Sequence, residues 1–296
     1  MGAQGDTSSG TVGTSTAPIH NEPDWGAHAP RGVSSALVWL SRNTFLGRGS
    51  QRKVIFRAFA ARHPGPVDIT LWGAPVRLFP HHNVCENKAL LRPDRMDPEE
   101  HDLVRRFMSG AARVMVDVGA NAGLYCLSAA FVAGAGSKII AIEPNAKLTQ
   151  RLAFNMAVAR RSGLVDRTLE LTVFNVAVSD NEGEAVLFGS GDEGGRSLTI
   201  DRGGAGMTVP TRPLAAIVDE TGVNHIDVLK IDVEGHEDHV LPPYLKARGG
   251  RPLPRFIVIE HISRADWKPD CISLCQESGY KVLAITRNNT MLEHSA

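Results

Sequence analysis

The sequence predicts an α/β fold with a mostly parallel sheet, and three observations lead to this prediction. From about residue 113 onward, short runs rich in valine and isoleucine alternate with segments of helical periodicity. The runs are almost continuously apolar, as expected of strands covered by helices on both faces. Polar residues and glycines follow directly after several of the runs. Parallel strands joined by right-handed crossover helices account for all three observations.

The chain before this alternating region divides into a tail and an extension. Residues 1–32 are rich in Gly, Ser, Thr and Pro and lack apolar periodicity, so we expect a disordered tail. Residues 33–112 form an N-terminal extension with helical pieces and a β-hairpin. Its expected elements are helices on either side of Gly47, a hairpin at 67–79 and a helix at 98–108. Asp97 has the residue type and position of an N-cap.

Residues 113–296 form the main domain. Its predicted strands lie at residues 114–118, 138–142, 169–178, 226–231, 256–259 and 281–285. Its predicted helices lie at residues 122–132, 146–161, 213–220, 235–245 and 269–278. The Gly-rich stretch 180–212 contains two short β-like pieces, which predict a hairpin at 184–200 inserted beside the sheet. The segment 281–293 predicts a final hairpin that places one antiparallel strand at the edge of the sheet.

Composition excludes several classes of protein. The chain has 296 residues, 32 of them Lys or Arg and 32 Asp or Glu, so no global basic excess indicates a nucleic-acid partner. None of the four cysteines forms a CxxC pair, which favours free thiols in a reducing compartment over a zinc site. No apolar run is long enough to span a membrane, and the first residues lack a signal-peptide pattern. We therefore expect a cytoplasmic protein.

The exit of the first parallel strand carries the first candidate binding residues. The stretch VDVGANAGLY places an acid before a glycine turn; its candidate residues are Asp117, Gly119, Ala120, Asn121 and Gly123. Glycines allow a ligand to approach the backbone. The spacing departs from the GxGxxG pattern, and an acid there would repel a pyrophosphate but suit the cationic S-adenosylmethionine. A tight turn without a ligand is the alternative.

The next two exits carry a candidate nucleoside site. Glu143 ends the second parallel strand about 20 residues after the glycine turn, where an acid can accept both hydroxyls of a ribose. Its alternative role is that of a first-turn acid favoured by the helix dipole. Asn175 and Ala177 follow on the third exit, where small residues could enclose an adenine ring. An ordinary strand end would explain them equally well.

The fourth and fifth exits carry the candidate catalytic residues. Asp232 and His236 lie in the acid-rich stretch LKIDVEGHE, and Glu260 and His261 end the following strand. Carboxylates and imidazoles that converge there could act as a base or hold an acceptor. A helix-start acid and solvated histidines are the alternatives. Asp232 is the strongest candidate, because a carboxylate that ends a buried strand needs a partner.

Five motifs, in order, carry a resemblance to a known family. They are VDVGANAGLY, AIEPN, NVAVSD, IDVLKIDVEGHE and IVIEH. Together they resemble the FkbM family of S-adenosylmethionine-dependent methyltransferases over roughly residues 65–285. The resemblance implies a Rossmann-like class I methyltransferase fold: a seven-stranded sheet with helices on both faces and an antiparallel final strand. The long low-complexity start is not part of the family pattern.

The resemblance also implies roles for the candidate residues. The residues Asp117, Gly119, Asn121 and Gly123 would line the methionine part of the cofactor. Glu143 would bind the ribose, Asn175 to Ala177 would flank the adenine, and Asp232 would face the methyl group. The acceptor would meet Asn83, Glu86 and Lys88 in the extension, together with the inserted hairpin. Mg²⁺ held by Asp232, Glu260 and His261 is a less favoured alternative, so no metal ligand is assigned.

The predicted function is methylation of a hydroxyl oxygen, with S-adenosylmethionine as the cofactor. The acceptor would be a small molecule or a glycan: a sugar, glycolipid or polyketide-type molecule. One rival is an inactive scaffold that binds the cofactor without turnover. Another is a nucleotide-dependent oxidoreductase, against which the missing GxGxxG pattern argues; comparing the binding of NADH and S-adenosylmethionine separates these classes.

Overall fold

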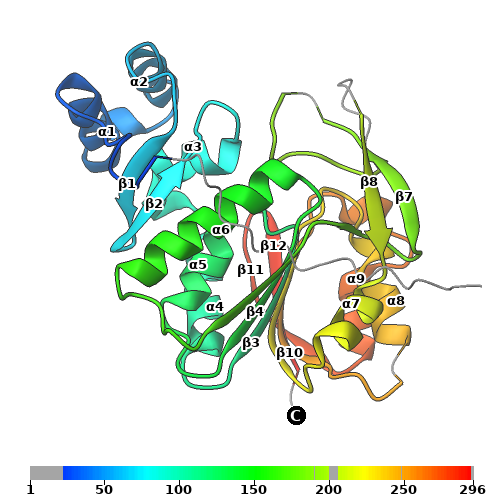
Figure 1. The fold of residues 1–296 in the computed structure, drawn as a ribbon. Coiled ribbons are helices and arrows are strands. Elements are labelled where there is room, and N and C mark those ends of the chain that lie inside the picture. Colours follow the sequence, from blue (N-terminus) through cyan, green and yellow to red (C-terminus); the bar gives the residue numbers. More distant parts are fainter. Residues whose placement is uncertain (1–22, 190, 200–205, 248, 295–296) are drawn as a thin grey trace, which may run out of the picture.

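The structure is a computed structural model that describes residues 23–189, 191–199, 206–247 and 249–294. At its centre is a seven-stranded sheet in the order β11-β12-β10-β9-β3-β4-β5 (Figure 1). The strands are β3 (Val114–Val118), β4 (Lys138–Ile142), β5 (Glu170–Phe174), β9 (Ile226–Ile231), β10 (Pro254–Glu260), β11 (Tyr280–Ile285) and β12 (Asn289–His294). β12 is antiparallel to both of its neighbours, and the pairs from β10 to β5 are parallel. The predicted fold class is confirmed.

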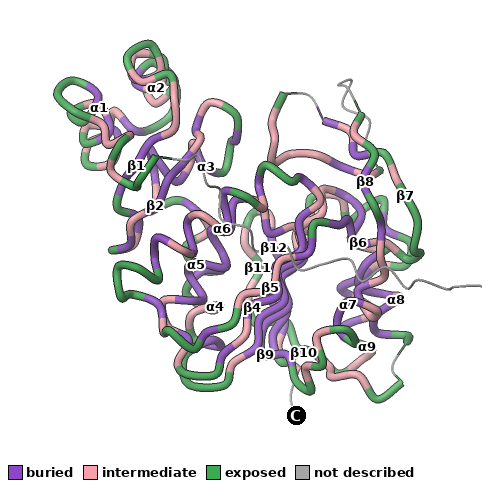
Figure 2. Tube along the Cα trace, viewed as in Figure 1, coloured by how far each residue is buried: buried purple, intermediate pink, exposed green. Residues whose placement is uncertain are grey.

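Helices cover both faces of this sheet. One face carries α4 (Pro98–Met108), α5 (Leu124–Ala130) and α6 (Ala146–Arg161), and the other carries α7 (Leu214–Thr221), α8 (Leu241–Lys246) and α9 (Cys271–Glu277). Successive residues of β3 join different cores: Met115 packs with the first set of helices, and Val114 and Val116 with the second. All of β3 is therefore buried, and Figure 2 shows the same burial along the neighbouring strands. Two covered faces explain why the strands are almost continuously apolar.

The N-terminal extension packs against α6. It contains α1 (Val33–Asn43), a 3₁₀ turn (Phe45–Gly47), α2 (Gln51–Ala60), β1 (Val67–Leu71), β2 (Ala74–Leu78) and α3 (Val84–Leu91), followed by a second 3₁₀ turn (Pro93–Arg95). β1 and β2 form the predicted hairpin. The side-chain amide of Asn155 on α6 accepts from the backbone N–H of Arg77 at 2.8 Å and donates to its carbonyl oxygen at 3.1 Å. These bonds attach the hairpin to the main domain.

Residues 23–28, which fall in the predicted tail, make defined contacts in the structure. Residues 23–28 lie on the hairpin: the buried guanidinium of Arg77 donates to the carbonyl oxygens of Pro23 at 2.9 Å and Asp24 at 3.0 Å. The carboxylate of Asp68 accepts from the backbone N–H groups of Gly26 at 2.7 Å and His28 at 2.9 Å. The predicted disordered tail was therefore wrong for these residues, and its first 22 residues lie outside those described.

The inserted hairpin uses a different second strand from the one predicted. The predicted strand 169–178 ends at Phe174, and β6 (Ala177–Val178) joins a separate sheet with β8 (Met207–Arg212) and β7 (Gly183–Leu187). β7 pairs antiparallel with β8, whereas the predicted partner near residue 197 forms only a single bridge, from Ser197 to Phe188. β8 was not predicted because it contains Pro210, and proline cannot donate a hydrogen bond to a neighbouring strand.

Two further expectations need correction. The predicted helix 235–245 is a 3₁₀ turn (Glu237–His239) followed by α8, which carries prolines in its first turn that cannot donate helix hydrogen bonds. The antiparallel strand β12 lies between β10 and β11, not at the edge. β12 is mostly buried and β11 mostly exposed, although β11 is the more apolar strand, so apolar content does not predict which strand takes the inner position. Within the described residues, the helices are too short or too polar to cross a membrane.

Candidate functional site

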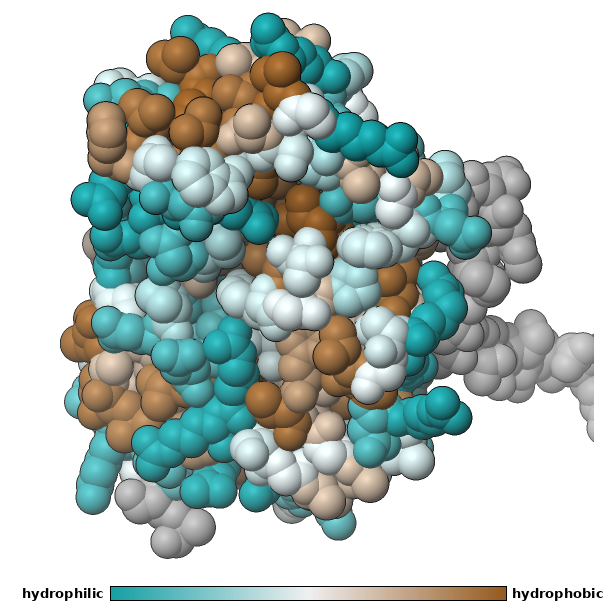
Figure 3. Space-filling model, turned by 90° about the vertical axis from the view of Figure 1, so that its left-hand side faces the viewer, coloured by the Kyte–Doolittle hydropathy of each residue, from teal (hydrophilic) through white to brown (hydrophobic). Residues whose placement is uncertain are grey.

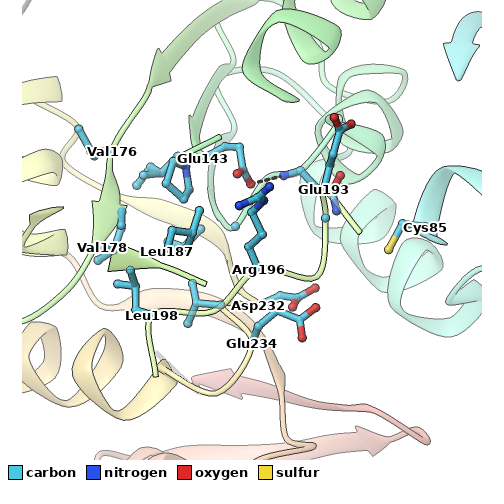
Figure 4. Close-up of a pocket in the computed structure, with 18 residues that line it drawn as sticks. Cys85, Glu143, Val176, Val178, Leu187, Glu193, Arg196, Leu198, Asp232 and Glu234 are labelled. Carbon is cyan, nitrogen blue, oxygen red and sulfur yellow. Dashed lines mark hydrogen bonds between the residues drawn. The ribbon is translucent and has the colours of Figure 1, made fainter. Parts of the chain in front are cut away.

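The candidate site lies where the strand order reverses. The chain runs from β3 outward through β4 to β5 and then returns to place β9 on the other side of β3, so a crevice opens beyond the carboxyl ends of β3 and β9. A cavity there contains about 650 Å³ of space outside the atoms, part of it open to solvent (Figure 4). It is lined by Cys85, Val118, Gly119, Asn121, Ile142, Glu143, Pro144, Val176, Ala177, Val178, Leu187, Glu193, Gly194, Arg196, Leu198, Asp232, Val233 and Glu234.

The glycines of the first exit serve packing within the protein. Gly119 has φ +75°, and a Cβ atom there would lie 1.8 Å from the carbonyl oxygen of Asp232. Gly123 has φ +81°, and a Cβ atom there would lie 2.5 Å from the side chain of Leu152. The backbone N–H groups of Gly119 and Ala120 both donate to the carbonyl oxygen of Ile142. The expectation that this turn leaves its N–H groups free for a ligand therefore needs correction.

Asp117 lies behind the turn and does not line the cavity. Its side chain is fully buried, with one carboxylate oxygen 3.4 Å from Nζ of Lys230. The thiol of Cys126 donates to the other oxygen at 3.2 Å. The acid predicted to face a cationic donor is thus paired inside the protein. Asp117 positions the turn in this structure.

Lys230 is a site residue that the sequence reasoning missed. Its Nζ atom donates to the carbonyl oxygen of Gly119 at 2.8 Å and lies 3.4 Å from carboxylate oxygens of both Asp117 and Asp232. The ammonium also lies 5.2 Å from the ring centre of Tyr125. Burial alone would lower the pKa of Lys230, but the two carboxylates raise it above its ordinary value. The available signal was a lysine near the end of a strand predicted to be buried.

Glu143 lines the cavity as predicted for a ligand-binding acid. One carboxylate oxygen accepts from the backbone N–H of Asn121 and the other from that of Asn145, each at 2.9 Å. Burial raises the pKa of Glu143 to about 7. Each oxygen has further acceptor capacity, so the carboxylate can bind two hydroxyl groups in addition to the two N–H groups.

Of the two residues predicted beside an adenine ring, only Ala177 lines the cavity. The amide of Asn175 donates to the carbonyl oxygens of Glu143 and Pro144, both at 2.9 Å, so it fixes the neighbouring exit from outside. Val176 and Val178 line the cavity beside Ala177, and Leu187 and Leu198 join them in Figure 4. These side chains form an apolar slot at one end of the cavity.

The acids of the fourth and fifth exits differ in their access to the cavity. Asp232 lines it and keeps 35% of its side chain exposed. Glu260 does not line it. Burial raises the pKa of Glu260 to about 9, and the negative charges of Asp232, Glu234 and Glu237 contribute in the same direction. The protonated form of Glu260 is therefore favoured, and the carboxylates of these two exits that line the cavity are those of Asp232 and Glu234.

The two predicted histidines lie outside the cavity lining. The ring nitrogens of His236 pair with the hydroxyls of Ser179 at 3.0 Å and Thr199 at 2.8 Å. Burial lowers the pKa of His236 to about 4. Nδ1 of His261 pairs with the hydroxyl of Thr290 at 2.8 Å. The parts of the chain that the structure describes contain no group of three or more His, Cys, Asp or Glu residues placed to hold a metal ion.

Two of the predicted acceptor residues, Asn83 and Glu86, are engaged with side chains of the main domain. Asn83 caps α3 by accepting from the N–H of Glu86 at 3.2 Å, and it donates to the side-chain oxygen of Asn121 at 2.6 Å. Glu86 is fully buried and pairs with Arg151 at 2.8 Å. Neither residue is exposed to an acceptor in this structure, because both are buried.

The charged end of α3 also departs from the sequence prediction. Lys88 pairs with Asp97 at 3.0 Å. Asp97 occupies the N-cap position of α4, as predicted, but it has a left-handed conformation and its side chain makes no capping bond. From α3, the residue that lines the cavity is Cys85.

A strap from the inserted hairpin, residues 187–198, closes one side of the cavity. The carboxylate of Glu193 binds Arg151 on α6 and lies 3.4 Å from Nζ of Lys147, and the N–H of Glu193 donates to the carbonyl oxygen of His82 at 2.8 Å. Arg196 projects into the part of the cavity near Glu143 (Figure 4). Both residues lie in the hairpin 184–200 that was expected to meet the acceptor, but neither was singled out, because their Gly-rich surroundings indicated turns.

The chain is similar to one known family and to several solved structures. The model of the methyltransferase FkbM domain matches residues 117–282. Among solved structures, a candidate O-methyltransferase from Klebsiella pneumoniae is 14% identical, with a TM-score of 0.42 and coverage of 68% of this chain and 81% of that one. An O-methyltransferase from Bacillus cereus in complex with SAH is 13% identical, with a TM-score of 0.39 and coverage of 65% and 76%. No curated protein matches the chain.

Proposed function

Because the chain belongs to the methyltransferase FkbM family, we propose that it transfers a methyl group from S-adenosylmethionine to a hydroxyl oxygen. The acceptor class that we propose is a sugar, glycolipid or polyketide-type small molecule. The observation that carries this proposal is the cavity at the reversal of strand order, which combines an apolar slot with the carboxylates of Glu143 and Asp232. Such crevices are the usual ligand sites of open parallel sheets.

The residues of the cavity fit the parts of this cofactor. The slot formed by Val176, Val178 and Leu187 suits a flat apolar ring. Glu143 offers two carboxylate oxygens to a ribose diol. Asp232 and Cys85 lie to the right of the slot residues in Figure 4, which leaves that part of the cavity for the methionine part and the acceptor.

The chain must orient the acceptor, remove its proton and exclude water. When bound, S-adenosylmethionine supplies a methyl group that its sulfonium already makes electrophilic. Asp232 can accept the proton of an acceptor hydroxyl, because it reaches the cavity and lies 3.4 Å from the ammonium of Lys230. Glu260 cannot act as a base at neutral pH while it holds its own proton. The strap limits the access of water to the slot through Leu187 and Leu198.

The acceptor can be sought directly. Purified protein is incubated with donor carrying a labelled methyl group and with lipid, sugar and small-molecule fractions of a cell extract. We expect label in a product that is stable to base as an ether, with activity retained in EDTA. Label on nitrogen or carbon alone would contradict O-methylation. Loss of activity in EDTA and its recovery with Mg²⁺ would restore the metal alternative at Asp232, Glu260 and His261.

The two rival functions predict different results. An inactive scaffold would bind S-adenosylhomocysteine but label no fraction. An oxidoreductase would bind NADH in preference to S-adenosylhomocysteine. Because Asp117 is buried and paired with Lys230, it cannot repel a pyrophosphate in the cavity, and this argument against an oxidoreductase no longer holds. The comparison of NADH with S-adenosylhomocysteine therefore decides between an oxidoreductase and a methyltransferase.

A further inference from the structure

The N-terminal extension contains a segment with a one-sided charge. Residues 25–67 contain seven of the 32 Lys and Arg residues of the chain and none of its 32 Asp and Glu residues. The remainder of this formally neutral chain therefore carries a net charge of −7. The basic residues are Arg31, Arg42, Arg48, Arg52, Lys53, Arg57 and Arg62. Such a separation of charge orients a protein in the field of a charged surface.

The same segment exposes large apolar side chains. Val33 is 59% exposed, Trp39 59%, Phe45 68% and Val54 64%. All four lie on α1, the 3₁₀ turn or α2. Figure 3 shows hydrophobic side chains gathered at the top of the molecule, the end at which Figure 1 places α1 and α2, with hydrophilic side chains beside them. We call these four residues and the seven basic ones the basic apolar surface.

Two of these basic residues make hydrogen bonds within the described structure. Arg42 Nε donates to the carbonyl oxygen of Leu90 at 2.8 Å, and Arg62 Nη1 donates to that of Ala58 at 3.0 Å. Arg48, Lys53 and Arg57 are exposed, and no ion pair joins them to another described residue. The charges are therefore available to an external partner.

We propose that the basic apolar surface docks the protein on an anionic phospholipid membrane. Aliphatic and aromatic side chains can enter the boundary between headgroups and acyl chains while the basic residues pair with anionic headgroups. A second copy of this chain fits less well, because it would bring seven positive charges against seven others. A nucleic acid would use the charges and the aromatic rings but not the exposed valines. The proposal does not depend on the methyl-transfer reaction.

Sedimentation with vesicles tests the proposal on the full chain. The probes are vesicles of phosphatidylcholine alone and vesicles that also contain about one third phosphatidylserine. We expect binding to the second kind only, with affinity falling steeply as salt increases. The triple variant Arg48→Gln, Lys53→Gln and Arg57→Gln should bind about 100-fold more weakly, since each basic residue near an anionic surface contributes about fivefold.

Matched variants separate docking from general charge or hydrophobicity. The same change of charge away from the surface, in Arg161→Gln, Arg167→Gln and Lys281→Gln, should alter affinity by less than about threefold. The double variant Trp39→Ala and Phe45→Ala should weaken vesicle binding at least about tenfold, and Leu164→Ala with Ile285→Ala should not. The far-UV circular dichroism spectrum should be unchanged in all four variants, which shows that they are folded and keeps this test independent of the proposed function.

Three results would overturn the proposal. One is the absence of binding to anionic vesicles at low salt. Another is tighter binding to single-stranded RNA of mixed sequence than to the vesicles, lost in the triple variant. A third is a dimer in lipid-free solution, measured by analytical ultracentrifugation, that Trp39→Ala and Phe45→Ala abolish; the surface would then be an interface between copies.

Discussion

Gly119 holds two strand exits together because it lacks a side chain. Its φ of +75° and the 1.8 Å separation between a Cβ atom and the carbonyl oxygen of Asp232 both exclude alanine. Gly136 has almost the same φ, +74°, but has no heavy atom within 4 Å of its Cβ position. Alanine variants at these two positions therefore separate the cost of a left-handed backbone from the cost of a steric clash.

We expect Gly136→Ala to lower the free energy of unfolding by about 1–2 kcal/mol, the cost of a left-handed alanine. Gly119→Ala should cost more than about 4 kcal/mol, because the backbone of β3 or β9 must also move. Urea denaturation of both variants measures the difference. Equal losses would show that the contact with Asp232 does not constrain the native state.

We expect substitution of Lys230 to disturb the charged part of the site but not the apolar slot. Lys230→Met would leave Asp117 buried without its cation, which costs about 3–5 kcal/mol in comparable pairs. Adding Asp117→Asn should return much of that stability, because it removes the uncompensated charge. The double variant should keep cofactor binding but lose kcat, because Asp232 loses its partner as well. A double variant as active as the parent would refute the positioning role.

Glu143 should make ligand affinity depend on pH. Its pKa is raised to about 7 in the free protein, whereas a carboxylate that accepts two hydroxyls must be ionised. Binding then releases a proton below pH 7, so affinity for S-adenosylhomocysteine should be constant above pH 8 and fall by up to about tenfold per pH unit below pH 7. Calorimetry from pH 5.5 to 8.5 gives this profile. Glu143→Gln should remove the slope, and a slope that persists would assign it to another group.

At the scale of elements, the strap depends on one carboxylate. Glu193 binds Arg151 and Lys147, and both are on α6. Glu193→Ala should increase hydrogen exchange in residues 189–198 and weaken cofactor affinity about three- to tenfold, because Leu187, Arg196 and Leu198 are then less ordered. Glu170→Ala is the control, since its pair with Lys138 is exposed and lies at the start of β5. Unchanged exchange in Glu193→Ala would show that the strap is held by other contacts.

Elements whose sequence pattern matches their burial in the fold could be predicted. β3, β4 and β9 match their predicted ranges because their apolar runs are bounded by polar residues or glycines. β8 could not be found, because Pro210 contradicts a strand pattern that the pairing with β7 overrides. The 3₁₀ turn before α8 was missed because the prediction rested on helical periodicity alone. Pro242 and Pro243 cannot donate helix hydrogen bonds, so a single helix does not continue through them.

At the scale of the whole molecule, the sequence indicates where the site lies but not how its charges pair. The rule that ligands bind beyond the strand ends identified Glu143 and Asp232, and both line the cavity. Lys230 contacts Gly119 across 111 residues of sequence, and Arg151 contacts Glu86 across 65. No local pattern encodes such contacts. For this reason Asp117 and Glu86 were predicted to face ligands, although each is buried against a cation.

The central claim is that the cavity beside Glu143 binds the methyl donor, and calorimetry with S-adenosylhomocysteine tests it most directly. The account predicts one site per chain, at least about tenfold weaker binding in Glu143→Gln, and no heat with NADH. A parent protein that binds NADH but not S-adenosylhomocysteine, or a Glu143→Gln variant with unchanged affinity at pH 8, would contradict it.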